Sequence, residues 1–229
     1  MVGKLVNWIA ENRDSIWVQW VHWNHIRRRD WFEYIPSTNS SWVWRRICKV
    51  KQEIAHGNSR SPVCWIKVIW TKWALPKHQF MGWIVAHEAL NTVDKLISYG
   101  MDVDPVCLIC GQANESLNHL YFTCQYSRRV LLLSLQQNTG CSFPLVIDLD
   151  WWSSRGGTKV QRGSQIALFL GAIYSIWYQR NKCRFDAVLV HPNQIALQVI
   201  EGVRNRIRGR EKEIKNANDI NWLCQKHLM

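Results

Sequence analysis

The chain lacks the sequence features of membrane-spanning, secreted and nucleotide-binding proteins. Its most apolar run, residues 166–178, is shorter than the roughly 20 residues that cross a bilayer, and it predicts a buried core helix. The N-terminus has neither an uninterrupted hydrophobic stretch nor a cleavage pattern, so no signal peptide is expected. Neither Gly-x-Gly-x-x-Gly nor Gly-x-x-x-x-Gly-Lys occurs, which excludes the two common phosphate-binding loops.

Acidic residues are scarce. Asp and Glu number 17 against 29 Lys and Arg, which gives a formal net charge of +12 at pH 7. Such an excess predicts a polyanionic partner, with nucleic acid first, whether RNA or DNA and with little sequence preference. No membrane partner is expected, because no segment is long enough to span one.

Strand signals are weak throughout the chain, and internal repeats are absent. Charged residues make up only 20% of the 229 residues and apolar ones 47%, so the chain can build one or two domains with a real core. The fold class predicted from these patterns is mostly α. It consists of a small helical domain flanked by Trp-rich and basic helices.

Disulfide bonds are not expected, although the chain has eight cysteines. Three of them lie in one cluster with a histidine, and the other five are scattered singly and odd in number. Reduced thiols predict a nuclear or cytoplasmic protein that is not secreted. The 15 tryptophans can stack on unpaired bases, but packing within a core or an interface is the favoured role for most of them.

The cluster has the spacing of a zinc site. Cys107, Cys110, His119 and Cys124 form the pattern C-x2-C-x8-H-x4-C, and Cys3His is a standard tetrahedral set of zinc ligands. Gly111 suits the tight turn after the first pair, because glycine tolerates positive φ. Four unrelated residues are the alternative, since cysteine is a common buried hydrophobe, but the close spacing argues against it. A set with all four positions filled by protein predicts a structural Zn²⁺, not a catalytic one.

Four segments are predicted along the chain. They are a Trp-rich basic N-terminal segment (1–56), the zinc-binding domain (62–140), a polar connection (141–163) and a C-terminal helical segment (164–229). A short loop separates the first two, because Gly, Asn, Ser and Pro gather there.

Helix signals precede the zinc pattern. Pro76 suits the first position of a helix. Thr92 is the predicted N-cap of a short second helix that ends at Gly100, with Leu96 and Ile97 packing inward.

Three further helices are predicted after the zinc pattern, over residues 127–135, over 164–180 and from Pro192 onward. The last one is amphipathic, and its apolar stripe should pack on the 164–180 helix. That stripe consists of Ile195, Val199, Val203 and Ile207.

Two groups of arginines are candidates for contacting nucleic acid. One follows the last zinc ligand and the other lies on the final helix; the residues are Arg128, Arg129, Arg204, Arg206, Arg208 and Arg210. Phosphate neutralisation by such side chains drives affinity. The alternative for the final helix is a solvated face that merely keeps it soluble, and the segment 27–29 would then be a further candidate.

Specific residues around the zinc pattern match those of a known family. They are Pro76-Lys77-His78, Phe80, Trp83, Leu90, Thr92, Leu96 and Gly100, followed by Cys107, Cys110, Gly111, Glu115, His119-Leu120, Phe122 and Cys124. With them the chain resembles the reverse transcriptase zinc-binding domain, which lies near the C-terminus of polyproteins of plant non-LTR (LINE-type) retrotransposons. Weaker matches include Trp17, Trp42, Ile176-Trp177 and Arg180-Asn181.

The resemblance implies a structural zinc ion and a fragment of a larger polyprotein. A reverse transcriptase holds its two catalytic metals with paired aspartates, and no Asp-Asp pair occurs in this chain. No nuclease carboxylate cluster can be assembled either, so no enzymatic activity is expected. The loop before Pro62 is shorter than the family usually has, which suggests that an internal piece is missing.

Three functions are compatible with these patterns. The first is a non-catalytic, zinc-stabilised module that binds RNA or DNA. The second is a structural zinc- and Trp-rich module that docks onto a reverse transcriptase polymerase domain. The third is a decayed element fragment without a selected role, which the shortened loop favours and the intact zinc pattern opposes.

Overall fold

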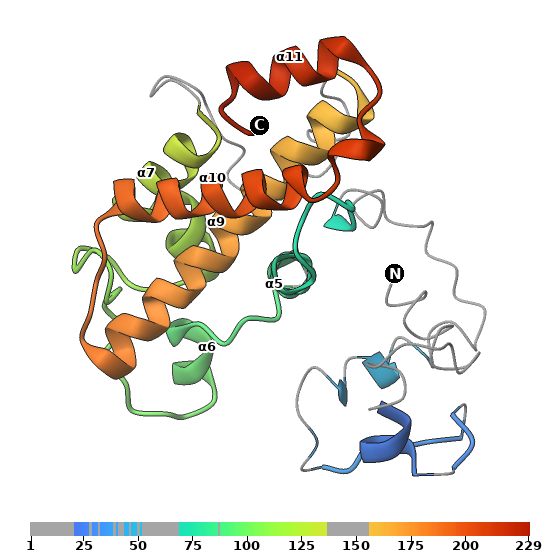
Figure 1. Ribbon diagram of the computed structural model, residues 1–229. Coiled ribbons are helices and arrows are strands. Elements are labelled where there is room, and N and C mark those ends of the chain that lie inside the picture. Colours follow the sequence, from blue (N-terminus) through green and yellow to red (C-terminus); the bar gives the residue numbers. More distant parts are fainter. Residues whose placement is uncertain are drawn as a thin grey trace. The chain divides into compact units, whose positions relative to one another are not determined.

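The computed structural model divides the chain into two compact units, Met1–Ile66 and Lys67–Met229 (Figure 1). The residues described are 21–27, 29–31, 33–38, 40, 44–45, 47–49, 51, 69–86, 88–136 and 156–229. The tryptophans before residue 21 lie outside these residues.

The described part of the first unit is held together by buried aromatic rings. Trp31 and Trp44 are both buried, and the Trp44 indole donates a hydrogen bond to the Tyr34 hydroxyl at 3.1 Å. The Lys51 ammonium lies over the Trp31 ring and donates to the backbone carbonyls of Trp31 (3.0 Å) and Tyr34 (2.5 Å). These two tryptophans are therefore core residues, as the packing interpretation expected, and do not form a stacking surface.

The second unit is built from helices, which confirms the predicted fold class. Among the described residues the only β-pairing is an isolated bridge between Val106 and Asn114. The elements are α5 (Pro76–Ala86), α6 (Val93–Ser98), η2 (His119–Thr123), α7 (Gln125–Ser134), α9 (Lys159–Asp186), α10 (Pro192–Arg208), η3 (Glu211–Glu213) and α11 (Ala217–Gln225). No helix in the described ranges is long and apolar enough to cross a membrane.

Helix α9 is the centre of this unit. Residues 166–173 are buried without interruption, because α5, α7, α10 and α11 all pack against this helix (Figure 1). The packing is close: a Cβ at Gly82 of α5 would lie 2.3 Å from a Leu170 methyl of α9. Close-packed side chains of this kind, not helix propensity, supply most of the stability of helices in proteins.

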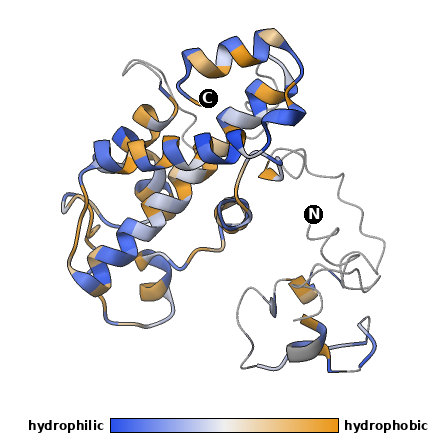
Figure 2. Ribbon diagram, in the orientation of Figure 1, coloured by the Kyte–Doolittle hydropathy of each residue, from blue (hydrophilic) through white to orange (hydrophobic). Residues whose placement is uncertain are grey.

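Helix α10 confirms the predicted amphipathic pattern. It begins at Pro192 and buries the expected stripe: Ile195, Val199, Val203 and Ile207. Figure 2 shows hydrophobic and hydrophilic residues alternating along its length. The stripe packs on α9, as predicted, and also on α7.

Helix α9 begins earlier than predicted. Its first residue is Lys159, which lies within the connection expected at 141–163. The cause is a capping box, in which the Gln161 backbone N–H donates to the Thr158 hydroxyl and the Gln161 side-chain oxygen accepts from the Thr158 N–H. These polar first turns carry no apolar periodicity that a sequence pattern could detect.

Helix α6 has the predicted start and end but not the predicted orientation. Thr92 is its N-cap, and Gly100 follows it with φ +82°. The inward packing expected of Ile97 is wrong, since that side chain is 43% exposed, and Leu96 is only half-buried. Val93 is the buried residue instead, because its N–H donates to a carboxylate that draws the first turn inward.

Candidate metal centre

A tight hairpin positions the first two candidate ligands. The Cys107 N–H donates to the Ala113 carbonyl at 2.8 Å, and the Cys107 carbonyl accepts from the Gly111 N–H at 2.8 Å. Gly111 has φ +65°, the left-handed conformation that the sequence suggested for it. This turn places the thiols of Cys107 and Cys110 on the same side of the loop.

One turn of π-helix positions the other two. His119 is the first residue of η2, and Cys124 directly follows its last residue. The Cys124 N–H donates to the His119 carbonyl at 2.9 Å, which closes the turn. Cys124 is also the N-cap of α7, so the zinc pattern ends where a core helix begins.

The structure brings all four side chains together. One ligand atom from each of Cys107, Cys110, His119 and Cys124 lies within 4.8 Å of every other. Donors bound about 2.0–2.3 Å from a single zinc ion lie roughly 4 Å apart, so these four atoms are close enough to hold one ion. The shortest approach joins the Cys110 Sγ and the His119 Nε2 at 3.3 Å.

The chemistry of the donors fits zinc. Cys107 and Cys124 are fully buried, and three sulfurs with one imidazole form the soft set that Zn²⁺ prefers. The second ring nitrogen of His119 lies 3.2 Å from the Thr123 hydroxyl, a contact that holds Nε2 toward the cysteines. No described group offers a fifth ligand in this cluster, which suits a structural ion.

The environment of Cys124 favours the thiolate form, which is the form that binds a metal ion. Hydrogen bonds from Cys107 and from the backbone N–H groups of Ser127 and Tyr126 lower the pKa of Cys124. The N-terminus of α7 contributes in this way, because its unpaired N–H groups favour a thiolate. The hydrogen bond to Cys124 and burial raise the pKa of Cys107.

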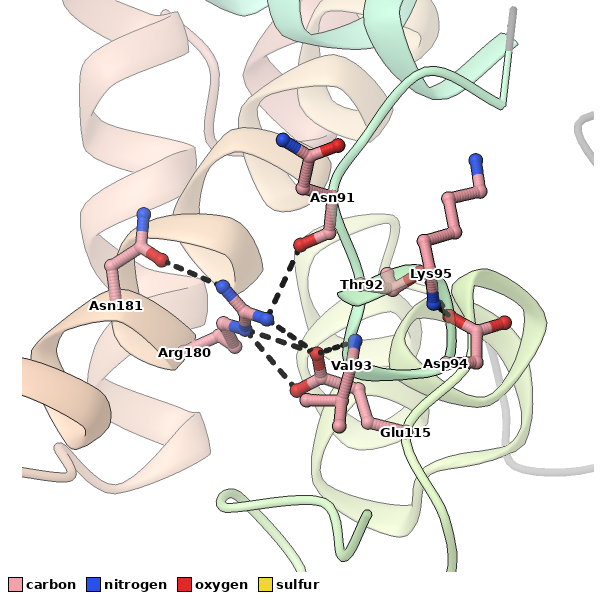
Figure 3. Close-up of polar contacts among 8 residues, drawn as sticks. All are labelled: Asn91, Thr92, Val93, Asp94, Lys95, Glu115, Arg180 and Asn181. Atoms are coloured by element: carbon pink, nitrogen blue, oxygen red, sulfur yellow. Dashed lines mark hydrogen bonds and ion pairs between the residues drawn. The ribbon is translucent and has the colours of Figure 1, made fainter. Parts of the chain in front are cut away.

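An ion pair that was not expected from the sequence anchors the zinc loop to α9 (Figure 3). The Glu115 carboxylate accepts from the Arg180 Nη2 at 2.6 Å and from its Nε at 3.2 Å. The Glu115 side chain is 0% exposed and that of Arg180 is 7% exposed. Glu115 also accepts from the Val93 N–H at 3.1 Å. A single carboxylate thus joins the zinc loop, the start of α6 and the central helix.

The guanidinium of Arg180 is satisfied on its other sides. It donates to the Asn181 side-chain oxygen at 3.2 Å and to the Asn91 carbonyl at 3.4 Å (Figure 3). Glu115 and Arg180 were both among the residues that matched the family, but nothing in a single sequence pairs residues 65 positions apart.

The arginines predicted to contact nucleic acid do not form one uniform surface. On α10, Arg204 donates to the His227 carbonyl at 2.7 Å, and Arg206 donates to the Lys72 carbonyl at 3.3 Å. Arg210 forms an ion pair with Glu213 at 2.6 Å. Arg208 is exposed.

The arginines after the last ligand lie on α7. Arg128 is exposed, and Arg129 donates to the Asn193 side chain at 3.0 Å, at the start of α10. Arg129 is therefore held near the start of α10, and both arginines are exposed.

Comparison with known proteins supports the zinc assignment. Residues 50–130 match the family model described as zinc-binding in reverse transcriptase, and this range contains all four candidate ligands. The family prediction is confirmed for this segment, while a plant non-LTR origin stays a prediction. No curated protein and no solved structure matches the chain significantly.

Proposed function

We propose that this chain, whose residues 50–130 match the zinc-binding family of reverse transcriptases, is a non-catalytic module that binds RNA or DNA beside a retrotransposon polymerase. Zinc held by Cys107, Cys110, His119 and Cys124 would cross-link the loop and supply no reaction chemistry. The absence of an Asp-Asp pair from the sequence supports the non-catalytic assignment. A nuclear or cytoplasmic location is part of this proposal.

The observation that carries the proposal is the distribution of charge. Residues 159–210 contain nine Lys or Arg and only two acidic residues, whereas residues 78–127 contain five acidic residues and one lysine. Phosphate binding requires positive charge, so the helices α9 and α10 are the favoured contact and the zinc loop is not. The zinc loop then organises the fold, and the basic helices meet the nucleic acid.

The test is a salt series with purified, zinc-loaded protein. Fluorescence anisotropy would follow binding to labelled RNA and DNA oligonucleotides. The variant changes Arg204, Arg206, Arg208 and Arg210 together to Gln. Every phosphate that the variant no longer neutralises should reduce the slope of log K against log salt by about 0.7–0.9, so we expect weaker binding with a flatter salt dependence.

A charge-matched control separates this surface from net charge. Changing Lys95, Lys212, Lys215 and Lys226 to Gln removes four positive charges from outside α9 and α10 in the same unit. It should leave the salt slope closer to that of the parent chain. Equal reductions in the two variants would mean that net charge alone attracts nucleic acid, and no change in the arginine variant would move the surface to Arg128 and Arg129.

The second candidate function is docking onto a reverse transcriptase domain. It is favoured by exposed apolar side chains in the acidic zinc segment: Ile97, Tyr99, Met101 and Leu108. Apolar surface next to Asp102 and Asp104 suits a protein partner and repels phosphate. Salt-insensitive binding to a polymerase domain, without binding to nucleic acid, would favour this function. Binding to neither would favour a decayed fragment.

A further inference from the structure

One face of α9 presents a row of aromatic side chains to solvent. Tyr178 and Phe185 follow Tyr174 by four and eleven residues, and these spacings place all three on one side of a helix. The opposite side, which includes Ile173 and Ile176, is completely buried in the core. Core packing therefore accounts for one side of α9 and not for the aromatic side.

These rings are accessible. Phe185 is 78% exposed and Tyr178 is 45% exposed, and Tyr174 is half-buried. The Tyr174 and Tyr178 rings are nearly parallel, at 12°, with their centroids 6.4 Å apart. Large aromatic rings seldom remain exposed in a row on a soluble surface unless something covers them.

Lysines accompany the rings. The Lys77 ammonium, from α5, lies 4.8 Å from the Tyr174 ring centroid, and the Lys182 ammonium lies 5.8 Å from that of Tyr178. Lys182 also forms an exposed ion pair with Asp186 at 3.4 Å, which is worth little in water. His78 packs on Tyr174, and burial lowers its pKa to about 4, so the histidine is neutral at neutral pH and the lysines carry the charge.

We propose that this surface, made of Tyr174, Tyr178, Phe185, Lys77 and Lys182 and called here the α9 aromatic face, binds single-stranded nucleic acid. Unpaired bases stack on the rings while the lysines contact the flanking phosphates. The inference rests on the proposed function, and it specifies that the ligand is single-stranded and which surface binds it.

The physical chemistry favours a single strand over a duplex. Surfaces that bind single strands combine positive charge with aromatic rings, because every base has a face that can stack. In a duplex those faces are already stacked on one another. A lysine has a flexible four-carbon stem, so a base that displaces its ammonium from a ring leaves that charge free to reach a phosphate.

The test compares strandedness at constant phosphate number. Tyr178→Ala with Phe185→Ala removes the two most exposed rings, and Leu133→Ala with Ile97→Ala is the control that removes exposed apolar side chains from α7 and α6. Binding to a single-stranded oligonucleotide and to a duplex with the same number of phosphates would be measured by anisotropy. We expect the ring variant to lose about tenfold or more in single-strand affinity, with little change for the duplex.

A conservative variant separates stacking from structural damage. Tyr178→Phe keeps the ring and removes the hydroxyl, so it should retain the single-strand affinity. Equal reductions in affinity for single strand and duplex, or no reduction at all, would overturn the inference. If the single-strand affinity is unchanged while an apolar peptide from a polymerase domain no longer binds, the face belongs to a protein partner.

The proposed function and this inference can fail separately. If the chain binds no nucleic acid, both fail. If the quadruple arginine variant loses binding and the ring variant does not, the proposed function stands and only the α9 aromatic face is excluded.

Discussion

The zinc segment and the helical core of the second unit are stabilised by different means. Residues 88–124 contain only two short elements, α6 and η2, and their chain path is fixed by tight turns around the four candidate ligands. Helices α9 and α10 are 28 and 17 residues long and bury continuous apolar sides. The core should therefore fold by burying hydrophobic surface, whereas the zinc segment needs a metal cross-link to stay ordered.

The two regions also differ in charge, and they are joined by a buried ion pair in addition to the contacts of η2 with α7 and α9. The core helices are basic and the zinc segment is acidic, which separates the proposed nucleic-acid surface from the metal. The ion pair is the buried contact between Glu115 and Arg180. The comparison suggests that zinc orders the loop and that the ion pair fixes its position on the core. The zinc ion and the ion pair can be removed independently of each other.

Removing zinc should produce the largest effect, and it should be confined to one region. Binding of structural zinc to small peptides is worth on the order of 10–16 kcal/mol at neutral pH. We expect chelation, or Cys124→Ser, to expose residues 100–130 to proteolysis and hydrogen exchange while α9 and α10 stay protected. Mass spectrometry of peptide-resolved exchange would measure both regions in one experiment.

The matched control is Cys224→Ser. Cys224 is an exposed free cysteine on α11, outside the metal cluster. This variant should retain its zinc and its exchange pattern. Loss of protection in α9 after chelation would show that the core also depends on the metal, and unchanged protection of 100–130 would remove the structural role of zinc.

Features that depend on neighbouring residues can be predicted from the sequence. The ligand pattern is recognisable because four donors within 18 residues define one site. Pro76 and Pro192 mark helix starts, since proline at the first turn acts locally. The buried stripe of α10 is visible because a 3.6-residue period survives in the sequence.

Features that depend on tertiary contact cannot be predicted in this way. The Glu115–Arg180 pair joins residues far apart in the chain, and nothing local distinguishes a buried carboxylate from an exposed one. The apolar character of Ile97 predicts a core position, but the single turn of α6 turns Val93 inward instead. The α9 aromatic face is hidden in the sequence, because Tyr174 and Phe185 look like parts of an apolar core helix.

Breaking the junction should have the second largest effect. Glu115→Gln leaves the Arg180 guanidinium buried with no countercharge, and removing one partner of a buried pair typically costs about 3–5 kcal/mol. We expect the free energy of unfolding, measured by urea denaturation of the zinc-loaded protein, to fall by that amount. Asp186→Asn is the control: it breaks the exposed Lys182–Asp186 pair and should cost less than about 1 kcal/mol. Equal costs would show that the junction contributes no more than a surface pair.

Substituting glycines within the helical core should have the smallest effect, and its sign should depend on the neighbours. Gly82→Ala places a Cβ 2.3 Å from a Leu170 methyl between α5 and α9, so we expect the protein to be destabilised by about 1–3 kcal/mol. Gly202→Ala on α10 meets no atom within 4 Å, and alanine is favoured over glycine in a helix by about 0.5–1 kcal/mol, so this variant should be slightly more stable. Thermal and urea unfolding would measure whether each variant is less stable or more stable than the parent chain. Neither substitution touches the zinc loop, so zinc content should stay the same in both. If Gly82→Ala lowers zinc content, the core and the zinc segment are coupled more strongly than the single ion pair at their junction implies.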